Sequence, residues 1–407
     1  AHAYLIWGVE NLSHKIVGTD FDPASAKKGN EPLENWLLRL LQPRIHFRLV
    51  EVFLDEKRIV CMEVERAVRH PVSFSGTEYV RIGEVKKPLK DAPDRERDLW
   101  RIFDDTPFEN LVAAERVDGN DVLQLLDYPA YFELLDQPLP PSSDTIVAAL
   151  AGDGIIHACD AGGWNITNLG AILLAKQIDR FDRLQRKAIR VVQYRGRGRT
   201  EALREQVGNK GYAAGFEGLL SYINGILPAN EVVGEALRKV VPMFPELAVR
   251  ELVANALIHQ DFSVSGAGPM LEIFDDRIEI TNPGDPLVDT ARFIDSPPRS
   301  RNEALASMMR RFRICEERGS GIDKVVFEVE LFQLPAPLFE AANGSTRAVL
   351  YAHKELRDME KSDRVRACYL HACLCYVTND KMTNTTLRKR FGISGQNASA
   401  ASRLLNE

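Results

Sequence analysis

Three polar residues with helical spacing stand in the segment ELVANALIHQDF, residues 251–262. At about 100° per residue, Glu251, Asn255 and His259 fall on one side of a helix, opposite leucine, valine and alanine. They offer an ionisable carboxylate, an amide and an imidazole, groups that exchange protons or hydrogen bonds. Asparagine is unfavourable in a helix interior, so its position between two ionisable residues suggests a functional or structural role. A site of chemistry and an ordinary solvated face are both open.

Two alternating strands follow this helix in PMLEIFDDRIEITNPGDPLV, joined by a tight turn at two aspartates. A helix with Glu and Asn, then such a hairpin and a glycine-containing loop, resembles the GHKL ATPase domain of gyrases, Hsp90 chaperones, mismatch-repair proteins and histidine kinases. The resemblance is to a divergent branch found in bacterial proteins classed as transcriptional regulators. It implies a GHKL-like α/β sandwich over residues 181–352.

The resemblance implies roles for two residues of the polar stripe. In the family, the helix glutamate, where present, orients the attacking water, and the asparagine binds the Mg²⁺ that bridges the phosphates. By position these are Glu251, a catalytic candidate, and Asn255, a metal-binding and cofactor-binding candidate. A base and a metal ligand one turn apart can address opposite sides of one phosphate. The implied cofactors are ATP and Mg²⁺, which is compatible with a weak ATPase activity.

The other cofactor-binding candidates implied by the resemblance lie further along the chain. The family has an Asp-x-Gly whose Asp accepts the adenine amino group, and TNPGDP puts Asn282 and Gly284 in these places. The change removes a charge, although an asparagine oxygen can still accept that hydrogen bond. The candidates for the phosphates are Arg301 and Asn302 in PPRSRNEALASMMRRF, and Gly319 and Gly321 in EERGSGIDKV. A helix cap and a plain helix-entry turn are the alternatives.

The composition is that of an ordinary globular protein. A chain of 407 residues exceeds one ordinary core, so we expect two to four domains. The net charge of −6 argues against wholesale coating of nucleic acid but permits a local basic patch. No apolar run approaches the roughly 20 residues of a membrane helix, and a secretory pattern is missing, so we expect a cytoplasmic protein without a membrane partner. Six cysteines without C-x-x-C pairs predict neither a zinc site nor a disulfide framework.

Residues 1–90 alternate short β-rich runs with turn residues around one helix, PLENWLLRLL. The runs YLIWGVEN, KIVGTD, RIVCMEVER and RHPVSFSGTEYVRIGEV resemble the Alba-like domain of Schlafen proteins and of many such bacterial regulators. We expect an Alba-like nucleic-acid-binding domain that lacks its first part. Its candidate phosphate contacts are Arg66, Arg69 and Arg81, together with His70.

Some Schlafen proteins use this fold as a nuclease with clustered carboxylates. Glu63 and Glu65 occupy alternate positions of one strand, so they share a face and could bind a metal. The acidic and lysine residues expected upstream are missing from this chain. The phosphate-contact interpretation is therefore the simpler one.

A second basic cluster lies in the stretch YRGRGR, where Arg195, Arg197 and Arg199 are separated by glycines. Such a loop could follow a nucleic-acid backbone, and a solvated hairpin tip is the alternative. Residues 91–180 predict helices, a QPLPPSSD linker and a small winged-helix-like module of helix, hairpin and helix.

The tail, residues 361–407, predicts helix, helix, turn and helix, with Thr383 or Asn384 capping the second helix and Gly392 ending it. This is the layout of a winged helix-turn-helix without its wing. The last helix of such modules enters the major groove, where Gln396, Asn397 and Arg403 could reach bases or phosphates. A small packing or dimerisation module is the alternative.

Together these features predict a multidomain α+β protein with an Alba-like N-terminal domain, a GHKL-like sandwich and a C-terminal winged helix. The predicted function is a homodimeric, DNA-binding transcriptional regulator. One alternative is a nucleic-acid-remodelling ATPase or a Schlafen-like defence nuclease, and the missing Walker A pattern argues against a P-loop helicase. Another is a regulator whose inactive ATPase fold serves dimerisation.

Overall fold

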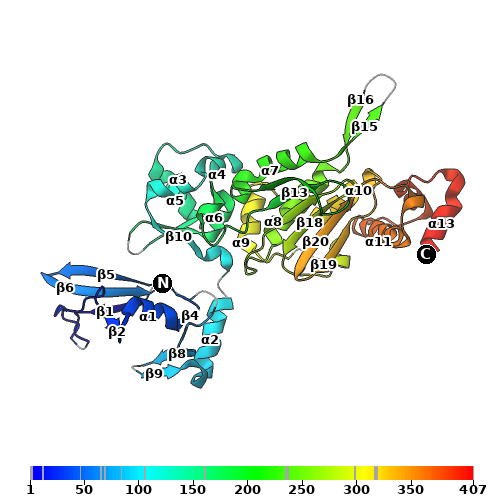
Figure 1. The fold of residues 1–407 in the computed structure, drawn as a ribbon. Coiled ribbons are helices and arrows are strands. Elements are labelled where there is room, and N and C mark those ends of the chain that lie inside the picture. The colour runs from blue at the N-terminus through cyan, green and yellow to red at the C-terminus, as the bar shows by residue number, and fades with distance from the viewer. Residues whose placement is uncertain are drawn as a thin grey trace. The chain divides into compact units, whose positions relative to one another are not determined.

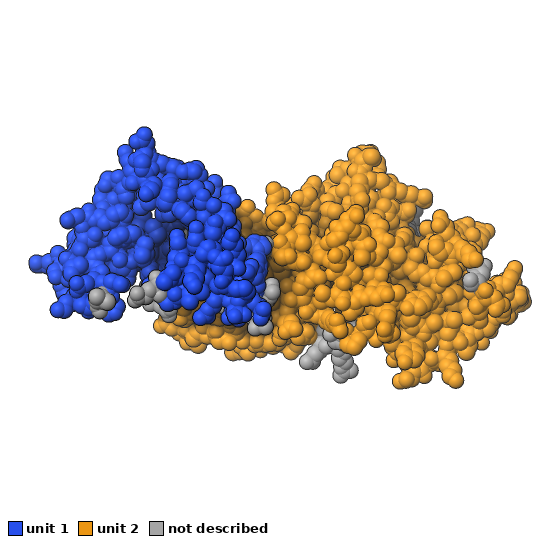
Figure 2. All heavy atoms as spheres, turned by 90° about the horizontal axis from the view of Figure 1, so that it is seen from below, with its two compact units in different colours: residues 1–107 blue, residues 108–407 orange. Residues whose placement is uncertain are grey.

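The computed structural model divides the chain into two compact units, Ala1–Pro107 and Phe108–Glu407 (Figure 1, Figure 2). It describes residues 3–11, 13–45, 47–64, 67, 70–83, 85–104, 107–159, 162–233, 238–297, 299–315 and 320–406. Both units mix helices with strands, so the predicted α+β class is confirmed. In the described ranges, every helix is too short or too polar to cross a membrane.

In its described residues the first unit contains three small antiparallel sheets, one of them the two-stranded pair β2-β3, and two α-helices. One sheet has the strand order β1-β6-β5, with β6 in the centre, and its core includes Phe47, Val60 and Met62. Another has the order β4-β7-β8-β9. The elements are β1 (Ala3–Trp7), β2 (Lys27–Lys28), β3 (Glu31–Pro32), α1 (Leu33–Leu40), β4 (Leu41–Gln42), β5 (Phe47–Leu54), β6 (Lys57–Val64), β7 (Ser73–Phe74), β8 (Thr77–Ile82), β9 (Val85–Pro88) and α2 (Pro93–Asp104).

The second unit begins with a small layer of helices on a three-stranded sheet, β10-β12-β11. All four of its described α-helices start at side chains that accept a backbone N–H, those of Asp118, Asp127, Ser142 and Thr167. The predicted helix, hairpin and helix are present as α5, β11 with β12, and α6. The elements are β10 (Val112–Val117), α3 (Gly119–Leu125), α4 (Tyr128–Leu134), α5 (Ser143–Gly152), β11 (Ile156–Ala158), β12 (Trp164–Thr167) and α6 (Asn168–Leu174).

The centre of the second unit is a six-stranded sheet of order β14-β13-β17-β18-β20-β19, in which only β13 and β17 run parallel. Its core is continuous with that of residues 108–180, across the predicted boundary at 180. The elements are β13 (Arg190–Tyr194), β14 (Ala202–Val207), α7 (Tyr212–Ile226), β15 (Ala229–Val233), β16 (Arg238–Pro242), α8 (Glu246–His259), β17 (Met270–Ile273), β18 (Arg277–Pro283), α9 (Glu303–Arg311), α10 (Gly321–Leu331), β19 (Leu338–Ala342) and β20 (Ser345–Tyr351).

Helix α8 is packed on nearly every side, which argues against the alternative of an ordinary solvated face. It contacts α7, α10 and β18. Leu252 and Leu257 are buried as predicted, but so are Val249 and Ile258. Because the helix lies inside the domain, a polar side chain on it must face either a partner or a cavity.

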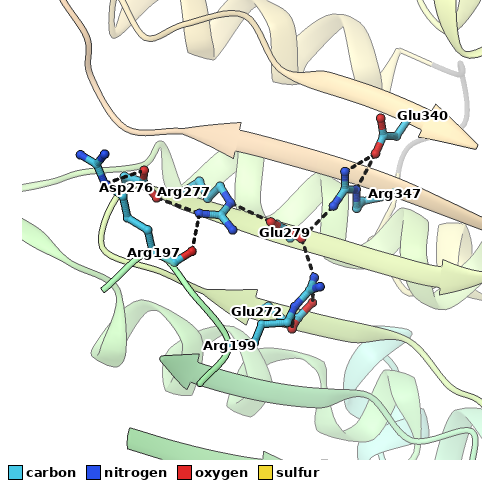
Figure 3. A network of polar contacts seen from close by, with 8 residues as sticks. All are labelled: Arg197, Arg199, Glu272, Asp276, Arg277, Glu279, Glu340 and Arg347. Atoms are coloured by element: carbon cyan, nitrogen blue, oxygen red, sulfur yellow. Dashed lines mark hydrogen bonds and ion pairs between the residues drawn. The ribbon is translucent and has the colours of Figure 1, made fainter. Parts of the chain in front are cut away.

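The opposite face of the sheet carries a network of charges (Figure 3). Glu272 on β17 and Glu279 on β18 are directly paired across the strands, and both are buried. Like charges in such pairs repel each other. Arg199 bridges them, with Nη2 at 2.8 Å from both carboxylates, and Arg277 and Arg347 bind Glu279 from either side. The loop that carries Arg199 is thereby held onto the sheet.

The tail forms α11 (Lys361–Val377), α12 (Asn384–Arg390) and α13 (Ala398–Asn406), in the predicted order of helices. Thr383 and Thr386 form a reciprocal capping box at the start of α12, and Gly392 follows its end at φ 62°. Both of these local predictions are confirmed. Helix α11 packs on α10 through a small cluster that includes Val326, Ala367 and Leu370.

Replacing Arg199 with Ala is expected to destabilise the second unit by about 1–3 kcal/mol, because Glu272 and Glu279 stay buried and face each other. Adding Glu272→Gln to this variant should recover much of the loss, since it removes one of the two charges. The matched control is Arg195→Ala, which breaks an exposed pair with Glu201 and should cost less than about 1 kcal/mol. Denaturant unfolding measures all three. Equal losses for Arg199→Ala and Arg195→Ala would contradict the assignment.

Candidate functional site

Helix α8, the sheet and the start of α10 enclose a cavity of about 390 Å³. All three residues of the polar stripe, Glu251, Asn255 and His259, line it. Strands β18 and β20 contribute Asn282 and Thr346, and α10 contributes Gly321. Four of the candidates found in the sequence, Glu251, Asn255, Asn282 and Gly321, therefore meet in one place. The stripe on α8 faces this cavity and not a solvated surface.

The start of α10 lies against α8 at a glycine. A Cβ at Gly321 would lie 2.9 Å from Glu251 Oε2 and 3.6 Å from Asn255 Nδ2. A larger side chain would displace the end of the Glu251 side chain, so glycine allows the two helices to approach with the carboxylate in this position. The other glycine of this motif, Gly319, lies outside the described residues.

His259 is held neutral at the third position of the stripe. Burial, together with the positive charge of Arg301, lowers the pKa of His259 from 6.5 to about 4. A neutral imidazole carries one donor and one acceptor nitrogen, so His259 brings hydrogen bonds to the cavity without a charge.

The part of the cavity near Asn282 is largely apolar. Phe293 and Phe339 line it, with ring centroids 5.5 Å apart. Asn282 is only 7% exposed, and in the described part of the chain its carboxamide has no hydrogen bond. Thr346, its partner in the β18–β20 register, donates its hydroxyl to Gly284 O at 2.8 Å. The carboxamide is the polar group left open at this end.

Two further arginines, Arg299 and Arg310, also line the cavity. Neither is among the candidates predicted from the sequence. Within the described ranges neither guanidinium has an ion-pair partner, whereas the neighbouring Arg311 binds Asp153 at 2.9 Å. No sequence signal separates Arg310 from Arg311, because both end the same helix. An unpaired cation in a cavity favours an anionic ligand.

Arg301, Asn302 and Gly284 support the cavity but do not line it. Asn302 Nδ2 donates to Ile258 O at 2.7 Å and to Gln260 O at 2.9 Å, which closes the end of α8. Arg301 donates to Asp285 O and pairs with Asp261. At Gly284, with φ 106°, a Cβ would collide with the Arg301 side chain. This geometry favours structural roles for Arg301 and Asn302 over the implied phosphate contacts.

The basic loop at 195–199 is less open than its sequence suggests. Arg199 is engaged by Glu272 and Glu279, so the structure disfavours its predicted phosphate contact. Arg195 pairs with Glu201 at 2.8 Å and Arg197 with Asp276 at 3.2 Å. Both of these pairs lie near the surface, with Arg197 82% exposed, and phosphate could compete for them.

The candidate nuclease carboxylates and phosphate contacts of the first unit are only partly described. Arg66, Arg69 and Glu65 lie outside the described residues. The Glu63 carboxylate is buried and binds Arg48 at 2.6 Å and Tyr4 at 3.3 Å. Within the ranges that the structure describes, no three His, Cys, Asp or Glu side chains come together as a metal site.

Three predicted nucleic-acid contacts in the tail are exposed. Gln396 and Asn397 precede α13, and Arg403 lies on it. Asn384 holds α13 to α12, because its Nδ2 donates to Ala398 O at 2.9 Å and to Ser402 Oγ at 3.0 Å. In the first unit Arg81 is exposed on β8, opposite Lys86 on β9.

Comparison with known families identifies two domains. Residues 1–90 match the family described as "Schlafen, AlbA_2", and residues 266–350 match the family described as "Putative ATP-dependent DNA helicase recG C-terminal". The chain thus carries a Schlafen AlbA_2 domain and an ATPase-like domain of the recG C-terminal type. The second match includes Asn282 and Gly321, whereas Glu251 and Asn255 precede it.

A comparison with curated proteins found no match. Among solved structures, the crystal structure of the DIP2311 protein from Corynebacterium diphtheriae is similar at 20% identity and a TM-score of 0.48. The similarity covers 99% of this chain and 78% of that chain.

Acidification should destabilise the second unit through His259. Because its pKa falls from 6.5 to about 4 on folding, the unfolded chain binds more protons between these pH values, and stability is lost as the pH falls from about 6.5 to about 4. His259→Gln should lose less stability than the parent between pH 7 and pH 4, by about 1–3 kcal/mol. The control is His353→Gln at an exposed histidine. Urea unfolding at each pH measures the difference, and identical pH profiles would refute it.

Proposed function

We propose that this protein is a DNA-binding transcriptional regulator whose ATPase-like domain binds a magnesium nucleotide in the cavity between α8 and α10. The observation that carries the proposal is the convergence of Glu251, Asn255, Asn282 and Gly321 on one cavity. These residues come from three elements spread over 71 positions of the chain. A volume of about 390 Å³ lies in the range of small-molecule and cofactor sites.

The residues present fit the phosphates and the metal. Arg299 and Arg310, which have no ion-pair partner among the described residues, supply positive charge. Gly321 begins an 11-residue helix, whose first N–H groups favour an anion. The Asn255 side chain lies beside Gly321, and its oxygen is a suitable ligand for Mg²⁺. Bound Mg²⁺ would neutralise phosphate charge and polarise the terminal phosphoryl group.

The position of Glu251 supports a role in orienting a water molecule toward such a phosphate. Its carboxylate is buried beside Gly321, one turn of α8 before Asn255. If the domain hydrolyses ATP, loss of this carboxylate should abolish hydrolysis and leave binding. If the domain binds ATP without hydrolysing it, loss of the carboxylate should leave nucleotide binding unchanged.

The walls of the cavity also contact the tail. Tyr369 on α11 donates to Ala291 O at 2.9 Å, two residues before the cavity-lining Phe293. Ile294 packs in one cluster with Ala367 and Leu370 of α11. A ligand that moves the 291–294 segment therefore moves α11, and with it α12 and α13. This path supports control of DNA binding by the nucleotide.

The AlbA_2 domain offers a basic hairpin for nucleic acid. Arg81 and Lys86 are paired directly across β8 and β9, and Lys86 Nζ lies 4.1 Å from the Tyr79 ring centre. Facing like charges repel each other, so an anion between them would be stabilising. This arrangement supports phosphate contacts by Arg81. Of the first-unit carboxylates proposed for a nuclease, Glu63 is engaged by Arg48, which supports binding over cleavage.

Magnesium nucleotide should raise the melting temperature of the parent protein, and Asn255→Ala should remove the Mg²⁺-dependent part of this shift. Without ligand, the variant should be as stable as the parent or more stable by a few tenths of a kcal/mol, because alanine is the better helix former. The control is Asn224→Ala on α7, which removes a helical asparagine away from the cavity. A parent that gains no stability from Mg-nucleotide, with an Asn255→Ala variant that is clearly destabilised alone, would defeat the proposal.

The protein should bind duplex DNA with an affinity that falls steeply as salt rises, because only local basic patches on an acidic chain can hold it. If α13 reads bases, the combined variant Gln396→Ala, Asn397→Ala, Arg403→Ala should lose its preference among sequences but keep non-specific binding. The control is Lys381→Ala at an exposed site between α11 and α12, which should leave the preference intact. Anisotropy titrations against selected and random duplexes decide it, and light scattering tests the homodimer. An unchanged preference in the combined variant would show that the tail has another task.

A further inference from the structure

Helix α11 has two apolar faces, one packed on α10 and one exposed. The packed face includes Ala367 and Leu370, which are buried in one cluster with residues of α10. On the opposite side of the helix, Val365, Tyr369 and Tyr376 are 44%, 45% and 76% exposed. Single exposed apolar side chains are ordinary, but a row of large ones along one helix marks an interaction surface.

The exposed row has the spacing of a seam between two helices. It consists of Val365, Tyr369, Ala372 and Tyr376, which are four, three and four residues apart. We call these four residues the α11 stripe. Alternate steps of four and three residues are those of a heptad seam, which packs against another helix at an angle of about 20°. The spacing therefore favours a helix as the occupant of this surface.

The α11 stripe matches a second copy of itself in the antiparallel direction. Its spacing is the same from either end, so a two-fold axis through its middle pairs Tyr369 with Ala372 of the partner subunit. The same axis pairs Val365 with Tyr376 of the partner subunit. Each layer then combines one large ring with a smaller side chain, which keeps the helices evenly spaced. A parallel pair would stack ring on ring and leave a gap at Ala372.

The charges at the ends of α11 also fit the antiparallel direction. Lys361 is the first residue of the helix, Asp380 follows its last turn, and both are exposed. An antiparallel pair brings Lys361 near Asp380 of the partner subunit at both of its ends. It also sets the positive end of each helix dipole beside the negative end of the other. A parallel pair would place like ends together.

The size of the α11 stripe indicates a weak dimer. From their exposed fractions, its three large side chains can remove roughly 300 Å² per subunit from water. A standard interface buries about 800 Å² per partner, so this contact belongs to the small, reversible class. We therefore expect association at micromolar concentrations.

We propose that α11 is a self-association helix through which two copies of this chain form a reversible antiparallel dimer. The inference goes beyond the proposed function and holds whether or not the protein binds nucleotide or DNA. Helices α12 and α13 both contact α11. The dimer therefore carries two copies of the predicted reading helix related by a two-fold axis, an arrangement that suits a palindromic DNA site.

Sedimentation equilibrium of the full chain, without nucleotide or DNA, measures the dimer. The parent should associate with a Kd of about 1–100 μM. Tyr376→Ser should raise this Kd at least about tenfold, because a symmetric pair loses the ring twice. Val365→Ser should raise it less, and it replaces Tyr376→Ser if that variant fails to fold. The control is Phe327→Ser, at a 54% exposed side chain of α10 outside the stripe, which should leave the Kd unchanged.

An exchange of charges tests the direction of the pair. Lys361→Glu should raise the Kd by about threefold, because it sets an acid beside Asp380 of the partner subunit. Adding Asp380→Lys to this variant should restore the parent Kd. In a parallel pair the two residues lie at opposite ends, so the second substitution would restore nothing and the antiparallel assignment would be wrong.

A parent that stays monomeric at roughly 200 μM would overturn the inference and leave the stripe to a helix of another protein. A dimer whose Kd is the same in the parent, Tyr376→Ser and Val365→Ser would overturn it as well, because the contact would then lie elsewhere. Neither result bears on the binding of magnesium nucleotide or DNA, which are measured by melting temperature and anisotropy. The inference and the proposed function therefore fail separately.

Discussion

The contact between α8 and the first residue of α10 sets the geometry on which the rest of the second unit depends. Gly321 lets the two helices approach until Glu251 lies where a side chain would be. From this point α10 runs to Glu330, which binds His371 on α11 at 2.9 Å and Arg390 on α12 at 3.3 Å. One helix therefore has the cavity at its start and the tail at its end. A rigid helix of this kind transmits a small displacement from one end to the other.

The charged contacts at the far end of α10 determine where the tail packs on this helix more than they add to the free energy of folding. Arg390 is 3% exposed, and burial lowers its pKa in spite of the nearby Glu330. Removing a guanidinium from water costs about as much as a buried ion pair returns, so its net contribution to the free energy of folding is small. What it specifies is position, because Arg390 also donates to Leu334 O at 2.7 Å. These contacts favour one orientation of the tail on α10.

The sequence was most informative where a local rule and a resemblance agreed. Helical spacing grouped Glu251 with Asn255, and the motif at the end of β18 added Asn282, although only the fold shows that these residues share a cavity. Arg301 and Arg310 are both arginines near the ends of α9, and only the fold shows that Arg310 lines the cavity while Arg301 binds Asp285 O and Asp261. The two glycines shortly before Arg199 predict an open loop, and the loop sequence alone does not identify the ion-pair partners of Arg199. The relevant signal lies in the two strands, where the carboxylates of Glu272 and Glu279 interrupt apolar runs and therefore need buried cationic partners.

Strand periodicity explains why Asn282 belongs to the cavity and not to the charged face. Side chains alternate along β18, so Glu279 joins the ion pairs, while Ile278, Ile280 and Asn282 continue one row on the helix side. A polar residue at the end of an apolar row has no route to solvent except through the cavity. Substitutions on the two faces of these strands should therefore have different consequences. Substitutions at Glu279 act on the stability of the sheet, and substitutions at Asn282 act on what the cavity binds.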